Sequence, residues 1–224
     1  MNKVNQMNLV GKRVFCDSEP TLSYDFLVEK ALAPNTYRGF HKISKTDDGA
    51  KKMFVNVLSS NSNYILSTLK LAKSEIEVDE LEEIICKELR EKLKKNIKGY
   101  QLASYNKLRK PTDIFIEHLM AMDITLSSAR KTLVGHLYLP LDSQIFKSDF
   151  IFTEDERRSL KIGRHFTFKD IHQRSHYLEI QEFLKNKAKT IGLENRIFFD
   201  LEWNDRWKSS GSNLFETNPS KKSK

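Results

Sequence analysis

The chain has 224 residues, with 38 Lys and Arg against 30 Asp and Glu, and a formal net charge of +8. This charge excludes an acidic disordered chain, and this length excludes a small disulfide-stapled scaffold. The 39% of hydrophobic residues are enough to bury a core. Eight Gly and five Pro are too few for the tight turns of a sandwich or barrel, so the composition favours helices.

Hydrophobic periodicity in the first half of the chain predicts a mainly α fold. A short helix is expected over residues 24–33, where Pro34 ends it. The apolar positions between residues 51 and 71 flank the polar run 59–63, which predicts two helices hinged at that run. Asp79 and Glu82 form a capping-box-like start for the next helix, whose single apolar stripe ends at Gly99.

A second group of helices is expected after residue 110. Pro111 suits the first turn of a helix that runs to Met122. Residues 123–128 are rich in capping side chains and predict a turn, and a further helix is expected over residues 129–138. The pattern indicates a helix-hairpin-helix element.

The last third of the chain predicts three more helix starts and an ambiguous segment. Thr153 with Glu156 and Thr167 with Asp170 are spaced as helix starts. Apolar residues at helical spacing over 177–191 predict a long helix that Gly192 stops. The aromatic-rich segment 196–207 is compatible with a helix or a strand. We expect residues 1–207 to form one domain and residues 208–224 to be a disordered basic tail.

The positive charge indicates a polyanionic partner. The tail from residue 208 holds four Lys and one Glu and so carries +3, which leaves +5 on the body. Short basic clusters in the body, among them Lys107, Arg109 and Lys110, are candidate contacts to nucleic-acid phosphates. No stretch approaches the roughly 20 apolar residues that span a bilayer. We therefore expect a cytoplasmic protein, a monomer, that binds DNA and no membrane.

Few residues form a recognisable catalytic motif. The sequence has no glycine-rich phosphate loop, and its two Cys cannot supply a cysteine-rich metal site, so we expect no metal and no cofactor. Lys131 follows Arg130, and a like charge with partial burial lowers the pKa of an ammonium and makes it a nucleophile. Asp142 could stabilise positive charge on a sugar. The ordinary alternatives are an exposed lysine and an aspartate that caps a helix.

Residues 127–146 (SSARKTLVGHLYLPLDSQIF) resemble the core of the helix-hairpin-helix DNA glycosylases. That resemblance implies a two-lobed helical bundle in which Lys131 is the nucleophile and Asp142 the catalytic aspartate. Residues 177–203 are similar to the closing helices of the archaeal 8-oxoguanine glycosylase branch, and residues 54–64 to an early family helix that precedes a strand-inserting turn.

The resemblance also implies how DNA would be held. The basic surface and the hairpin residues Ser127, Ser128 and Arg130 would contact the duplex backbone, and a target nucleotide would be flipped out of the stack. Asn61 and Asn63 would fill the vacated space. Aromatics such as Phe199 or Trp203 would stack on the flipped base, with core packing as the alternative for both.

Two other functions compete with base excision. The same basic clusters suit a non-catalytic nucleic-acid-binding regulator, which needs no chemistry. A metal-dependent nuclease of a defence system would place its acidic ligands far apart in the sequence.

Overall fold

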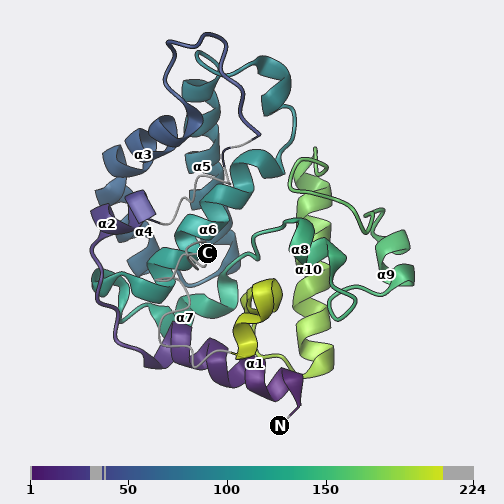
Figure 1. Ribbon diagram of the computed structural model, residues 1–224. Coiled ribbons are helices and arrows are strands. Elements are labelled where there is room, and N and C mark those ends of the chain that lie inside the picture. Colours follow the sequence, from purple (N-terminus) through teal and green to yellow (C-terminus); the bar gives the residue numbers. More distant parts are fainter. Residues whose placement is uncertain (1, 31–36, 38, 209–224) are drawn as a thin grey trace, which may run out of the picture.

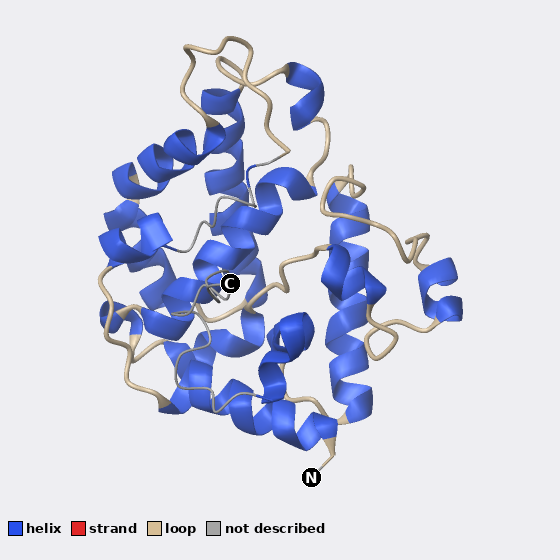
Figure 2. Ribbon diagram, in the orientation of Figure 1, coloured by secondary structure: helices blue, strands red, loops and turns tan. Residues whose placement is uncertain are grey.

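A computed structural model describes residues 2–30, 37 and 39–208 of the chain. Within these residues the fold is helical and contains no strand, as Figure 2 shows, so the mainly α prediction is confirmed. Two isolated bridges are the only sheet-like pairings there, one parallel between Leu22 and Asp123 and one antiparallel between Lys42 and Ile97. The end of the helix predicted over 24–33 and the tail expected to be disordered lie outside the described residues, apart from Lys208.

The N-terminal elements include a helix that the hydrophobic pattern did not predict. This helix, α1, opens the chain, and its first turn is capped by Asn2, whose side chain accepts a hydrogen bond from the Asn5 N–H at 2.9 Å. Two helices meet at Asn61, which confirms the hinge predicted over 59–63. The elements are α1 (Lys3–Lys12), the π-helical turn η1 (Arg13–Asp17), α2 (Tyr24–Lys30), α3 (Ala50–Ser60) and α4 (Ser62–Leu71).

Helix α5 (Glu75–Leu93) starts four residues before the predicted capping box. Its cap is Ser74, whose hydroxyl accepts from the Glu77 N–H at 3.4 Å, while the Glu77 carboxylate accepts from the Lys73 N–H at 2.7 Å. The predicted cap residues Asp79 and Glu82 are instead buried inside the helix. In both places an acidic residue stands three positions after a residue that can cap a helix, and the earlier pair, Ser74 and Glu77, is the one used.

Helix α6 (Asn106–Met122) also starts earlier than predicted, because Pro111 lies inside it and not in its first turn. The turn that follows contains a short 3-10 helix, η4 (Ile124–Leu126), where the Asp123 carboxylate accepts from the Thr125 N–H at 2.8 Å. The helix expected over 129–138 is reduced to the single turn α7 (Arg130–Leu133) and a 3-10 turn, η5 (Val134–His136). The pattern predicted the turn but overestimated the helix after it.

The C-terminal elements follow the predicted starts and stops more closely. They are α8 (Ser143–Lys147), α9 (Glu154–Ser159), α10 (Arg174–Ile191) and the 3-10 segment η6 (Arg196–Lys208). Thr153 and Glu156 form the predicted capping box of α9, and Gly192 ends α10 in the left-handed region with a φ of 80°. Thr167 and Asp170 close only a turn. The ambiguous segment is helical, with a kink over 203–205.

A single hydrophobic cluster joins elements from both ends of the chain. In Figure 1, α1 runs beneath the last described segment, and α6 lies between α5 and that segment. Phe15 of η1 stacks on Phe198 of η6 with ring centroids 6.0 Å apart. The first and last described elements therefore pack against each other. Among the described residues no helix is long and apolar enough to cross a membrane.

Candidate functional site

The structure does not bring the predicted pair Lys131 and Asp142 together. Lys131 lies exposed on the one-turn helix α7, and among the described residues it makes no ion pair. Its charge acts on the Cys16 thiol, which places Lys131 beside η1 at the end of α1. Asp142 lies at the start of α8, and its ion pair among the described residues is with a different lysine.

Asp142 is instead paired with Lys110 of α6. The Lys110 Nζ lies 3.2 Å from Asp142 Oδ2, while Asp142 Oδ1 accepts from the backbone N–H groups of Gln144 at 2.8 Å and Ile145 at 3.2 Å. The aspartate is thus the N-cap of α8 and fixed in orientation by that role. The side chains of Lys110 and Asp142 are 13% and 17% exposed, so this amine–carboxylate pair is partly exposed to solvent.

The backbone around the pair is fixed by buried hydrogen bonds. The Asn106 side-chain amide at the start of α6 donates to the Leu141 carbonyl at 3.0 Å, which ties the segment before α8 to α6. Gln181 of α10 binds both the N–H and the carbonyl of Leu139, at 3.1 and 2.7 Å. These bonds position Asp142 against Lys110 although the two residues are far apart in the sequence.

Segment η6 adds a second carboxylate beside the pair. Asp200 is ion-paired with Arg206, and the Arg206 guanidinium lies 4.3 Å from the centre of the half-buried Trp203 ring. Burial raises the pKa of Asp200; Arg206 opposes that shift and Asp142 adds to it. Because Asp142 and Lys110 both act on Asp200, these three groups form one electrostatic unit.

Glu117 lies below this unit, two helical turns after Lys110 on α6. It is 2% exposed, and its Oε1 has no hydrogen-bond partner among the described residues. Burial, and then the charge of Asp200, raises the pKa of Glu117 well above its usual value. The protonated form is therefore favoured, and Glu117 with Asp200 forms a pair of buried carboxyl groups that can hold a proton near Asp142.

Arg109 is not a phosphate contact, because its guanidinium is fully buried. Arg109 forms ion pairs with four carboxylates and lies against two tyrosine rings. The acidic partners are Asp79 at 2.9 Å, Glu82, Glu83 at 3.0 Å and Asp113 at 2.9 Å, and the ring centres of Tyr138 and Tyr177 lie 4.7 and 5.1 Å away. This network holds α6 against α5 and so supports the helix that carries Lys110.

Three further residues predicted to bind DNA or a base are buried as well. Arg130 is 2% exposed and donates to the backbone carbonyls of Val14, Ser18, Met120 and Ala121, so it caps helix ends and does not face a ligand. Lys107 is 3% exposed. Phe199 is fully buried in the core, which is the alternative role considered for it.

The remaining predicted contacts are accessible but lie in separate places. Asn61 is half-buried at the α3–α4 junction, where its amide donates to the Val57 carbonyl at 2.8 Å and to Glu88 at 2.9 Å. Asn63, Ser127 and Ser128 are exposed. Trp203 is half-buried next to Arg206, which is the ion-pair partner of Asp200.

Sequence reasoning missed Glu117 and Arg206, and it assigned Lys110 a different role. A usable signal was present for Glu117, since Lys110, Asp113 and Glu117 recur at helical spacing on one side of this helix. Among the described residues no group of three or more His, Cys, Asp or Glu side chains is arranged to hold a metal ion. No family model, curated protein or solved structure matches this chain.

Proposed function

We propose that this protein is a DNA glycosylase that excises a damaged or modified base, with Lys110 as the nucleophile in place of Lys131. The observation that carries the proposal is the 3.2 Å separation of Lys110 Nζ and Asp142 Oδ2 in a partly exposed position. An amine and a carboxylate within hydrogen-bond reach are the groups that covalent base excision needs. The resemblance of residues 127–146 to the glycosylases supports the assignment of Asp142.

The proposed reaction uses the pair in sequence. Asp142 takes a proton from the Lys110 ammonium, and the free amine attacks the anomeric carbon of a flipped nucleotide. As the new carbon–nitrogen bond forms, the bond to the base breaks, and the base leaves with that electron pair and takes the proton from Asp142. Opening of the sugar ring gives a Schiff base, which water hydrolyses to restore the lysine.

The surrounding residues would support this chemistry. Asp142 becomes an anion again as the leaving base takes its proton, and its negative charge then stabilises the positive charge that develops on the sugar. The half-buried Trp203 offers a ring on which the flipped base can stack. We further propose that the domain is two-lobed and that α6, the turn 123–128 and α7 form the helix-hairpin-helix element. The exposed Ser127 and Ser128 of that turn are then available to the DNA backbone.

Borohydride trapping on duplexes that carry a panel of modified bases tests the proposal. We expect a covalent adduct with the wild-type protein and with Lys131→Gln, and none with Lys110→Gln. The two variants are matched because each removes one ammonium from a lysine that is not fully buried. An adduct that persists in Lys110→Gln, or the absence of base release from every modified duplex, contradicts the proposal.

A non-catalytic nucleic-acid-binding protein is the second candidate, and exposed lysines at the end of α5 favour it. Lys92, Lys95 and Lys98 are exposed and have no ion-pair partner in the part of the chain that the structure describes. The Lys98 N–H donates to the His41 carbonyl at 3.0 Å, so this basic end is ordered by backbone bonds. This function predicts salt-dependent DNA binding without any covalent adduct.

A further inference from the structure

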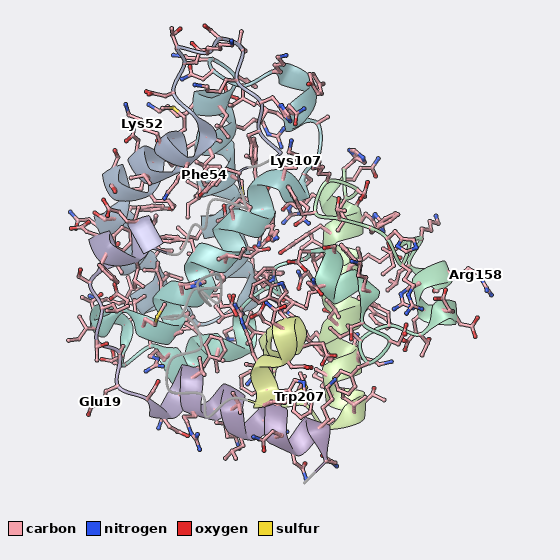
Figure 3. All side chains as sticks on the ribbon, in the orientation of Figure 1. Glu19, Lys52, Phe54, Lys107, Arg158 and Trp207 are labelled. Carbon is pink, nitrogen blue, oxygen red and sulfur yellow. The ribbon has the colours of Figure 1, made fainter. Side chains whose placement is uncertain are left out.

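A group of basic and aromatic side chains converges at the N-terminal end of α6, beyond the amine–carboxylate pair. The loop before α10 is fastened there, since the Ser104 hydroxyl and the Asn106 N–H both donate to the Ile171 carbonyl, at 2.9 and 3.2 Å. Figure 3 labels Lys107 at this end of α6. The loop contributes Phe168 and Lys169.

Lys107 is a buried ammonium that has no counter-ion within the described part of the chain. Its Nζ donates to the Gly39 carbonyl at 2.6 Å and to Gln101 Oε1 at 2.7 Å, and it lies 4.6 Å from the centre of the Phe40 ring. Among the described residues neither Lys107 nor Lys169 is ion-paired with a carboxylate. Burial, followed by the like charge of Lys169, lowers the pKa of Lys107 to about 8.

Gly39 marks the point where these side chains meet. A Cβ at this position would lie 3.2 Å from Lys107 Cε, 3.2 Å from Phe168 Cζ and 3.3 Å from Lys169 Cε. The half-buried Phe168 ring also lies 5.2 Å from the Lys110 Nζ and 5.9 Å from the Lys169 Nζ. Two ammonium groups, those of Lys110 and Lys169, therefore flank the Phe168 ring, and the Lys107 side chain approaches the same Gly39 position. Among the described residues Asp142 is the only carboxylate that forms an ion pair with any of these three lysines.

We propose that Lys107, Phe168 and Lys169 form a nucleotide subsite, in which the ammonium groups hold a phosphodiester and the Phe168 ring stacks on the neighbouring base. A bound phosphate supplies the counter-charge that the two lysines lack and relieves their mutual repulsion. Lys169 is exposed and contacts the phosphate directly, whereas Lys107 acts from below as a fixed positive charge. Any base can stack on an aromatic ring, so this subsite would bind the strand without sequence specificity.

The inference deepens the proposed function and depends on it for the source of the phosphate, which is a DNA strand. Lys110 lies one helical turn after Lys107 and contacts the same Phe168 ring. The subsite thus adjoins the amine–carboxylate pair and would hold the nucleotide next to the one that reacts. A free nucleotide carries the same phosphate and base, so the experiment must separate the two sources.

Fluorescence anisotropy with a labelled single-stranded oligonucleotide, recorded between about 50 and 200 mM salt, tests the subsite. Loss of one phosphate contact lowers the slope of log affinity against log salt by about 0.7, which we expect for Lys169→Gln. Lys70→Gln, which removes an exposed lysine of α4 outside the cluster, should leave the slope unchanged. Phe168→Ala should weaken binding by about 5-fold or more with the slope retained.

The outcomes are distinct. Equal slopes for wild type and Lys169→Gln overturn the subsite, provided that circular dichroism shows both proteins folded. Binding of a deoxynucleoside monophosphate that depends on Lys169, without oligonucleotide binding, overturns the DNA strand as the source. If the salt slope depends on Lys169 but no borohydride adduct forms, the subsite stands and the glycosylase proposal is overturned. If an adduct forms but Lys169→Gln leaves the salt slope unchanged, the glycosylase proposal stands and the subsite is overturned.

Discussion

Replacing Arg109 by Met should strongly destabilise the protein. The methionine side chain is close in volume to the aliphatic part of the arginine side chain, but it lacks the charge that faces the four carboxylates, Asp79, Glu82, Glu83 and Asp113. The side chains of Asp79, Glu82 and Asp113 are 8% exposed or less, so water cannot replace the guanidinium. Breaking a buried ion pair by removing one partner costs about 3–5 kcal/mol.

The pH dependence of that loss follows from the carboxyl groups. Burial already raises the pKa of Asp113 to about 7, with Arg109 opposing the shift, and it raises the pKa of Glu82 as well. Removing Arg109 therefore raises the pKa values of Asp113 and Glu82 further. A carboxyl whose pKa is higher in the folded protein than in the unfolded one stabilises the fold at low pH and loses that contribution as pH rises. The deficit of the variant should therefore be larger near pH 8 than near pH 5.

Urea unfolding followed by circular dichroism at about pH 5 and about pH 8 measures both effects. Arg109→Lys is the control, because a lysine keeps one positive charge but its single ammonium cannot contact all four carboxylates. Its free energy of unfolding should lie between those of wild type and Arg109→Met. A deficit below about 1 kcal/mol for Arg109→Met, or one that is the same at the two pH values, would refute the account of this network.

Two further substitutions test the packing and the buried carboxyl pair. Gly11→Ala would place a Cβ 2.6 Å from the fully buried Phe198 ring and should cost about 1–3 kcal/mol in thermal or urea unfolding, whereas Gly99→Ala, with nothing within 4 Å, should be nearly neutral. The Glu117→Gln side chain cannot ionise, whereas ionisation of Glu117 is costly in the fold because its pKa is raised. The free energy of unfolding of Glu117→Gln should therefore equal that of wild type near pH 4 and exceed it by about 1 kcal/mol or more near pH 8. A melting temperature difference that does not change with pH would contradict the assignment of Glu117 as a buried acid.

The candidate site was predictable only in part. Asp142 was expected to cap a helix or to act in catalysis, and the structure shows that it caps α8 while also facing an ammonium. Lys131 was expected to be that ammonium because it follows a turn and stands next to Arg130. The prediction was wrong about its surroundings, since Arg130 turns inward to backbone carbonyls and Lys131 remains exposed beside η1.

Three local signals were confirmed, although the capping box at Asp79 and the helix start at Pro111 were not. The capping box at Thr153, the glycine stop at Gly192 and the break at Asn61 lie where the sequence predicted them, because each depends on hydrogen bonds or a φ angle within a few residues. The 3-10 form of η6 was not predictable from its mixed pattern. It is decided by packing of its aromatics on η1, as the stack of Phe15 on Phe198 shows.

The sequence by itself determined that the chain is helical, basic and divided by recognisable caps and stops. The tertiary structure alone decided which charged residues meet. Lys110 reaches Asp142 because Asn106 and Gln181 anchor the segment before α8, and Arg109 is buried because α5 presents carboxylates to it. Helical periodicity reports which face of one helix is apolar, whereas the partner of a polar side chain depends on how distant helices pack.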